Sequence, residues 1–232
     1  MTATSKPVAL VTGGNRGIGF AIAQGLLAKD YQVMITARSL TSAEQAAAKL
    51  SGNVVPVALD ISQDDSIEQA VATIRQHSDR LDVVINNAGV YPDEGVNILT
   101  IRRELLAATL NTNTLGAIRL TQACLPLLKA AAAARVINTS SGYGEINGLS
   151  AAVPSYCLSK LALNGATIML AQALQPHGIT VNAIDPGWVK TDMGGDAAPR
   201  SPEQGADTAI WLATAALRET GKLWRDRQVI AF

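Results

Sequence analysis

The sequence predicts one α/β domain built on a doubly wound, mostly parallel sheet of about seven strands flanked by helices. Apolar runs of strand length alternate with longer amphipathic stretches, a glycine-rich turn follows the first run, and no linker or internal repeat divides the 232 residues. A chain of this length with 48% hydrophobic residues can bury a substantial core. We therefore expect residues 1–232 to form a single domain.

The predicted strands are the apolar runs at residues 8–11, 32–37, 54–59, 83–86, 135–139, 180–184 and 223–225. The predicted helices are the longer stretches at residues 18–28, 42–50, 66–77, 101–130, 154–173 and 202–216. Asp64 and Ser201 are candidate N-caps, and Pro202 suits a first helical position.

Charge and cysteine content exclude several classes of partner. The 19 basic and 19 acidic residues cancel, so nothing draws the chain as a whole to nucleic acid or to anionic membranes. Cys124 and Cys157 do not make a disulfide framework, which fits a reducing compartment. Residues 1–7 contain no apolar leader, and no later apolar run approaches the length of a membrane span. We expect a cytoplasmic protein with no nucleic-acid or membrane partner.

Three irregular stretches, at residues 91–96, 142–153 and 187–200, are rich in Gly, Pro, Ser or Asp. Each of them follows the carboxyl end of a predicted strand. Open α/β sheets bind their ligands at that edge. These stretches are therefore the predicted walls of a substrate pocket.

The glycine-rich turn spans residues 12–19, Thr-Gly-Gly-Asn-Arg-Gly-Ile-Gly, directly after the first strand. A strand that runs into such a turn and then into a helix brings backbone N–H groups and the helix N-terminus close to a pyrophosphate. Glycines after a strand also occur where the chain only turns. The position at the first strand favours dinucleotide binding, as in Rossmann-type folds.

Tyr156 and Lys160 lie four residues apart, so they share one face of the predicted helix. A tyrosine with its ordinary pKa of about 10 is a poor proton donor near neutrality, but a nearby positive charge favours its anionic form. Lys160 is a source of that charge. The alternative is an exposed tyrosine capped by a lysine, with no role in chemistry.

Taken together, these residues resemble the short-chain dehydrogenase/reductase family, and most of all its carbonyl-reductase-like members. The resemblance covers nearly the whole chain. It rests on Gly13, Gly17, Gly19, Asp60, Asn86, Asn87, Ala88, Gly89, Asn113, Ser141, Tyr156, Lys160, Pro186, Gly187, Trp188, Val189, Thr191, Asp192 and Met193. It implies nicotinamide-dependent interconversion of a carbonyl and an alcohol.

The resemblance also implies a role for each catalytic residue. Tyr156 protonates the carbonyl oxygen as hydride reaches the carbon, and Ser141 polarises that oxygen. Lys160 lowers the pKa of the tyrosine and binds the nicotinamide ribose. Asn113 holds a water that links Lys160 to solvent.

Two of these assignments have close alternatives in the sequence. Ser140 also ends the fifth strand, but Ser141 matches the second serine of the family pattern. Asn111 lies two residues before Asn113, within the same predicted helix. A buried amide there needs partners, and its alternative role is a helix kink.

By the same resemblance, Asp60 bonds the adenine, although Asp is also common in turns. Residues 86–89 form a backbone wall beside the adenosine, and Thr191 binds the carboxamide. The residues expected to bind the cofactor are Gly13, Asn15, Arg16, Gly17, Ile18, Gly19, Arg38, Ser39, Asp60, Ile61, Asn87, Ala88, Gly89, Tyr156, Lys160, Pro186, Gly187, Val189 and Thr191.

The end of the second strand favours NADPH over NADH. An acidic residue at that point accepts bonds from the ribose 2′-OH, but here the residue is Arg38, and no acid follows until Glu44. An arginine fork suits a phosphate, Arg16 adds a second positive charge, and Asn15 and Ser39 add neutral donors. The alternative is that Arg38 stacks on the adenine or points to solvent.

The predicted function is NADPH-dependent reduction of a ketone, aldehyde or quinone that carries an apolar group. The alternatives are a 3-oxoacyl-thioester reductase and a non-catalytic NADP(H)-binding regulator. The two histidines and two scattered cysteines have no metal-ligand spacing, so no metal is expected. The helices that begin near residues 101 and 154 often pair between subunits in this family, which implies a homodimer or homotetramer.

Overall fold

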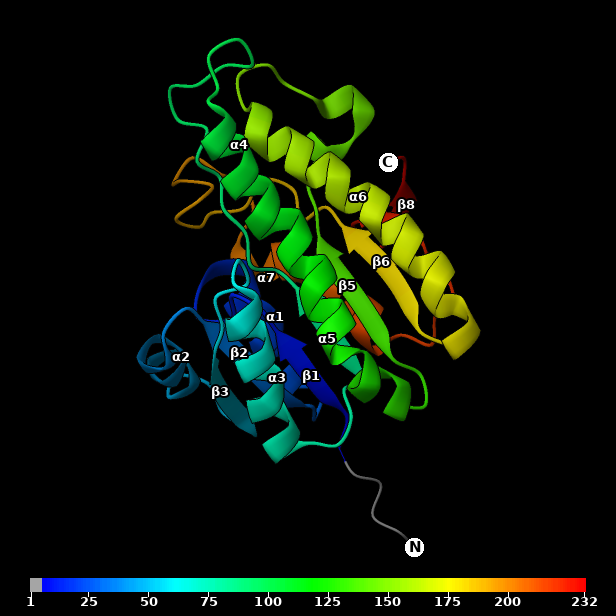
Figure 1. The fold of residues 1–232 in the computed structure, drawn as a ribbon. Helices are drawn as coiled ribbons and strands as arrows, with labels where there is room; N and C mark the ends of the chain where they lie inside the picture. The colour runs from blue at the N-terminus through cyan, green and yellow to red at the C-terminus, as the bar shows by residue number, and fades with distance from the viewer. Residues whose placement is uncertain (1–5) are drawn as a thin grey trace, which may run out of the picture.

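The computed structural model describes residues 6–232 and shows an eight-stranded sheet with helices on both faces (Figure 1). This architecture confirms the predicted doubly wound α/β fold. The predicted absence of an apolar leader falls mainly on residues 1–5, which lie outside the described residues.

The strand order is β3-β2-β1-β4-β5-β6-β7-β8. The strands are β1 Val8–Val11, β2 Gln32–Ala37, β3 Val54–Ala58, β4 Val83–Asn86, β5 Arg135–Thr139, β6 Thr180–Ile184, β7 Leu223–Arg225 and β8 Gln228–Ile230. The first seven are parallel and confirm the seven predicted strands. Only β8 is antiparallel in the described part of the sheet, so the sheet is mixed.

The sequence analysis missed β8 because its signals are weak. The strand has three residues, and the turn before it is Asp226-Arg227. Both turn residues have positive φ, 51° and 62°. Tight hairpin turns of this kind usually carry Asn, Asp or Gly followed by Gly, and here Arg227 stands where that second Gly would mark the turn.

The direction of winding reverses between β1 and β4. Strand β1 pairs with β2 on one side and with β4 on the other, and all three run parallel. The chain therefore leaves the centre of the sheet in both directions, and the carboxyl ends of the strands meet at one edge with a crevice at the reversal. The predicted loops 91–96, 142–153 and 187–200 come after β4, β5 and β6, at this edge.

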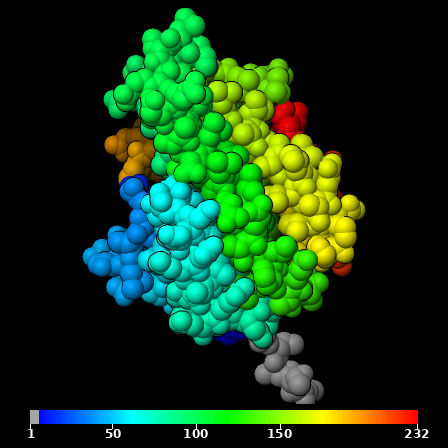
Figure 2. Space-filling model, viewed as in Figure 1, coloured from blue at the N-terminus to red at the C-terminus, as the bar shows by residue number. Residues whose placement is uncertain are grey.

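Helices α3, α5 and α6 cover one face of the sheet, the face seen in Figure 2, and α1 and α7 cover the other (Figure 1). Their bounds are α1 Gly17–Leu27, α2 Leu40–Ala47, α3 Asp64–His77, α4 Arg103–Leu110, α5 Gly116–Ala130, α6 Pro154–Leu174 and α7 Pro202–Thr214. These seven elements account for all six predicted helices, since the longest predicted helix is divided.

Capping decides where several helices begin. Ser201 accepts a bond from the Gln204 N–H in a full capping box with Pro202 in the first turn, as predicted. The prediction of Asp64 as an N-cap is wrong, because the helix begins at Asp64 itself and Gln63 occupies the cap position. Helix α2 begins two residues earlier than predicted, because the Ser39 hydroxyl caps it.

The predicted helix over residues 101–130 is interrupted by a π-helical turn, Asn111–Leu115, between α4 and α5. Such turns often occur at functional sites, because the extra residue in the turn redirects the side chains around it. Asn113 lies at the centre of this turn and is buried. The sequence therefore predicted the helical segment but not the irregularity that positions Asn113.

By length and composition alone, one helical stretch among the described residues, Pro154–His177, is long and apolar enough to cross a membrane. Half of its most apolar window is buried inside the domain, where α6 packs on β6. A core helix of this length passes the same test.

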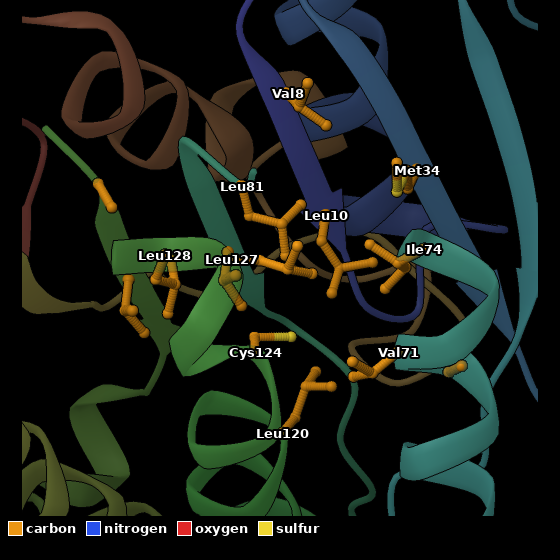
Figure 3. Close-up of a cluster of buried hydrophobic side chains, with 14 of the residues drawn as sticks. Val8, Leu10, Met34, Val71, Ile74, Leu81, Leu120, Cys124, Leu127 and Leu128 are labelled. Atoms are coloured by element: carbon orange, nitrogen blue, oxygen red, sulfur yellow. The ribbon is translucent and has the colours of Figure 1, made fainter. Parts of the chain in front are cut away.

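Alternate residues of the central strand face opposite cores. Val8 and Leu10 belong to the cluster under α3 and α5, whereas Ala9 and Val11 belong to the cluster under α1 and α7. Figure 3 shows Leu10 between Leu127 of α5 and neighbouring side chains of α3. This two-sided burial explains why the strand reads as a continuous apolar run.

Gly116, at the start of α5, lies against the segment that follows β3. A Cβ on Gly116 would lie 2.4 Å from the main-chain oxygen of Ile61. We predict that Gly116→Ala lowers the free energy of unfolding by about 1–3 kcal/mol, because overpacking against backbone outweighs the better helix propensity of alanine. Urea unfolding measures the change. Gly165→Ala in α6 is the matched control, because a Cβ there meets nothing within 4 Å and should stabilise the protein. Equal stabilisation by both variants would contradict the close approach.

Candidate active site

The glycine-rich turn has the backbone conformation that the sequence predicted. Gly13 and Gly17 have φ of 62° and 54°, in the left-handed region that favours glycine. At Gly19 the constraint is close approach, because a Cβ there would lie 2.3 Å from the Gly13 main-chain oxygen. The turn therefore leaves its backbone bare at the N-terminus of α1, where a pyrophosphate binds in folds of this kind.

A buried threonine, Thr12, ties this turn to the end of β4. Its hydroxyl oxygen accepts bonds from the N–H groups of Asn87 and Ala88, both at 2.9 Å. The Asn87 side chain returns a bond to the Thr12 carbonyl, also at 2.9 Å. The Asn87 amide thus holds the turn in place, and the sequence analysis missed Thr12 because a buried threonine at a strand end carries no distinctive pattern.

The residues predicted for the adenosine end lie after β2 and β3. Arg38 is exposed and has no ion-pair partner within 4 Å among residues 6–232. Asp60 accepts bonds from the Ser62 N–H at 3.0 Å and hydroxyl at 2.7 Å, and these bonds lower the pKa of its carboxyl. Ser39 caps α2, and the side chain of Ile61 lies in the core. Asp60 and Ser39 therefore have local structural roles in addition to any contact with a ligand.

The loop after β6 folds back over the glycine-rich turn. A Cβ on Gly17 would lie 3.0 Å from Cγ2 of Thr191, and Arg16 forms an ion pair with Asp192. The loop begins at Gly187, which has φ of 74°. The other predicted residues of this region are buried or half-buried: Asn15, Ile18, Pro186 and Val189.

Lys160 is buried in α6, with 4% of its surface exposed. Its Nζ donates to the main-chain oxygen of Thr139 at 2.7 Å and lies 5.4 Å from the centroid of the Tyr156 ring. Burial lowers the pKa of Lys160 from its usual 10.5 to about 8. A Cβ on Gly89 would lie 3.7 Å from the same Nζ, so the segment after β4 reaches this point as well.

Burial raises the pKa of Tyr156 to about 12, and a hydrogen bond with the Ser141 side chain acts in the opposite direction. This differs from the expectation that Lys160 lowers the pKa of the tyrosine. Desolvation of the phenolate is the largest cause of the shift, and Lys160, whose Nζ lies 5.4 Å from the ring centroid, does not offset it. In the chain alone, the phenol therefore holds its proton at neutral pH.

The two serines at the end of β5 face different ways. Ser140 is buried, and its hydroxyl donates to Oδ1 of Asn164 at 2.6 Å. Ser141 is half-buried, its hydroxyl oxygen accepts from the Tyr143 N–H at 3.2 Å, and its side chain acts to lower the pKa of Tyr156. Of the two candidates, Ser141 is thus the serine beside the phenol.

Both N–H groups of the Asn113 side-chain amide are engaged in hydrogen bonds, and its oxygen accepts a third. It donates to the Val90 carbonyl and to the Ser159 hydroxyl, each at 2.9 Å, and accepts from the Val90 N–H at 2.8 Å. Asn111 instead bonds to Ser62, away from Lys160.

Two tyrosines that the sequence analysis did not single out contact the Tyr156 ring edge to face. The ring centroid of Tyr91 lies 4.9 Å from that of Tyr156, and Tyr143 lies at 6.2 Å. They come from the predicted loops 91–96 and 142–153. The loops were predicted from their composition, but nothing in the sequence indicated that their aromatic rings meet.

The chain belongs to the short-chain dehydrogenase family, which it matches over residues 7–201. It is 34% identical over 249 residues to the short-chain dehydrogenase anuI of Penicillium roqueforti, covering 99% of this chain and 98% of that protein. It is 38% identical over 190 residues to the 3-oxoacyl-(acyl-carrier-protein) reductase FabG of Pseudomonas aeruginosa, covering 80% and 75%. An NADPH-bound carbonyl reductase from chicken fatty liver has a similar structure, with a TM-score of 0.89 and 31% identity over 99% of this chain and all of that one.

The buried lysine predicts a specific pH dependence of stability. Between pH 8 and 10.5 the unfolded chain keeps the Lys160 proton and the folded chain releases it, so its contribution to stability increases with pH. Relative to Lys160→Met, the wild type should gain about 2 kcal/mol in free energy of unfolding between pH of about 7 and about 9.5. Urea unfolding at both pH values tests this, and parallel pH curves for the two proteins would contradict it.

Proposed function

We propose that this protein is an NADPH-dependent carbonyl reductase in which Tyr156 is the general acid. The observation that carries the proposal is that Tyr156, Ser141 and Lys160 converge at the carboxyl end of β5, where Gly89 of the segment after β4 also comes close to Lys160. A ketone, aldehyde or quinone with an apolar group fits the partly exposed rings of Tyr91 and Tyr143, which lie against the Tyr156 ring.

The residues present fit a phosphorylated dinucleotide. The bare backbone of Gly13 to Gly19 suits the pyrophosphate, and the exposed guanidinium of Arg38 suits a 2′-phosphate. The carbonyl reductase from chicken fatty liver, similar over its whole length, is NADPH-bound. Arg16 has to exchange Asp192 for the phosphate if it is to contribute.

When bound, a reduced nicotinamide supplies the hydride. The chain supplies the proton: the phenol of Tyr156, with a pKa of about 12, is protonated at neutral pH and donates to the substrate oxygen as negative charge develops on it. The Ser141 hydroxyl bonds to the same oxygen and polarises the carbonyl. The ammonium of Lys160 then stabilises the phenolate that remains.

A second candidate is reduction of a 3-oxoacyl thioester. The 38% identity to the FabG reductase of Pseudomonas aeruginosa favours it. Both candidates use the same three residues, so substrate preference separates them: a higher kcat/KM for a 3-oxoacyl thioester than for any simple ketone, aldehyde or quinone would favour the second.

An assembly of two or four copies fits the surface of α6. Leu158, Ile168 and Met169 of this helix are exposed. A second copy of the chain would cover these apolar side chains, in agreement with the pairing that the family resemblance implies.

We predict that Tyr156→Phe lowers kcat for carbonyl reduction by at least about 100-fold, since it removes the acid. The dissociation constant for NADPH should stay close to the wild-type value, because phenylalanine keeps the ring. Steady-state NADPH oxidation and a fluorescence titration measure the two quantities. Tyr31→Phe is the matched control, because its hydroxyl bonds to the Ala213 carbonyl outside the site.

Full activity of Tyr156→Phe would defeat the proposed mechanism. Tight NADPH binding by the wild type without turnover of any carbonyl in a broad panel would instead favour a cofactor-binding regulator.

We predict that Arg38→Asp weakens NADPH binding by about 10- to 100-fold, because the aspartate removes a charge-assisted bond to the 2′-phosphate and repels it. Binding of NADH should weaken less or improve. Titration of both dinucleotides tests this, with Arg75→Asp, at an exposed arginine on α3, as the control. Tighter binding of NADH than of NADPH to the wild type would overturn the phosphate argument.

A further inference from the structure

The segment Val90–Asp93, here called the strap, leaves the end of β4 and crosses to the start of α6. Its first residue is fixed by Asn113, whose side chain bonds both the N–H and the carbonyl of Val90 at 2.8 and 2.9 Å. The Asn113 amide thus pairs with both main-chain groups of Val90, as the main chain of a neighbouring strand does in a β-sheet. The strap is therefore anchored at its beginning.

The last residue of the strap, Asp93, is buried, with 3% of its surface exposed. Its Oδ1 accepts from the Ser155 N–H at 3.0 Å, and its Oδ2 accepts from the Ser155 hydroxyl and the Tyr156 N–H, each at 2.9 Å. All three donors belong to the first turn of α6. The carboxylate thus bonds the backbone of the proposed general acid.

This capping comes from far away in the sequence. The N-cap residue of α6, Val153, makes no side-chain cap bond, so the first N–H groups of the helix lack a local partner. Asp93, 62 residues before Ser155, takes that place. A negative charge at a helix N-terminus is also favoured by the helix dipole.

Between the two anchors lies Tyr91. Its ring meets the Tyr156 ring edge to face at 4.9 Å, and 38% of its surface is exposed. Because the strap is bonded at Val90 and at Asp93, Tyr91 has little freedom to leave Tyr156. A partly exposed ring held against the general acid is placed to contact the group attached to a substrate carbonyl.

We propose that Asp93 is a positioning residue of the active site, and that through the strap it holds Tyr91 as a specificity-determining wall of the substrate pocket. This inference rests on the proposed role of Tyr156 as general acid. It assigns functions to Asp93 and Tyr91, two residues that have no role in the proposed cofactor site.

The first test is Asp93→Asn, in which an NH₂ group replaces one acceptor and faces the N–H donors of α6. We expect kcat to fall by about 10- to 100-fold, because a small displacement of Tyr156 misaligns the proton donor. NADPH binding should stay near the wild-type value. Asp82→Asn is the matched control, because Asp82 accepts bonds from Val8 N–H at 2.8 Å and Arg80 Nε at 3.1 Å at the opposite edge of the sheet.

If Asp93 has a merely structural role, both variants lower the melting temperature and neither changes kcat, and that result would overturn the inference. If Asp93→Asn does not fold, Ser155→Ala removes one of the three bonds. A fall in kcat of about 2- to 10-fold is then expected, and an unchanged kcat would again overturn it.

The second test separates KM from kcat at Tyr91. Tyr91→Ala should raise KM for substrates with a large apolar group and leave KM for the smallest aldehyde nearly unchanged, whereas Tyr91→Phe keeps the ring and should restore the wild-type KM. Equal KM changes for large and small substrates would contradict the role of Tyr91 as a wall of the pocket.

Failure of this inference can be told apart from failure of the proposed function. If the wild-type protein is active and Tyr156→Phe is not, but Asp93→Asn changes kcat no more than Asp82→Asn does, only this inference fails and the proposed function stands.

Discussion

The bond from the buried ammonium of Lys160 to the Thr139 carbonyl connects α6 to the end of β5, and the arrangement of the site depends on it. A charge so deeply buried is costly unless it is bonded, so this contact has few alternatives. It places one face of α6 over the carboxyl edge of the sheet. Tyr156 and Lys160 share that face, and both therefore lie close to Ser141, which follows the end of β5.

Helix α6 also gathers the loops around it. Asn113 bonds Ser159 of α6 as well as Val90, and Asp93 bonds the first turn of the helix. Asn164 accepts from Ser140 and donates to the Gly144 carbonyl at 2.9 Å, which fixes the loop after β5. Two of the three predicted substrate loops are thus bonded to one helix, so the shape of the pocket and the position of the proton donor are coupled.

The electrostatics of the chain alone keep the proton on Tyr156. The chain alone holds Tyr156 protonated and lowers the pKa of Lys160 to about 8 by burial. A protonated phenol is the form that reduction of a carbonyl requires. Oxidation of an alcohol needs the phenolate, which requires positive charge beyond what the protein groups supply here.

Much of the fold and part of the candidate site could be predicted from local patterns in the sequence. The seven parallel strands, the glycine-rich turn and the Tyr156–Lys160 pair depend on apolar periodicity and on spacing within one element, so the sequence alone determined them. Strand β8, the π-helical turn at Asn113 and the capping of α6 by Asp93 depend on partners far away in the chain. The same holds for the raised pKa of Tyr156, which depends on burial. Only the tertiary structure decided these, because burial and long-range hydrogen bonds have no periodicity that a sequence can display.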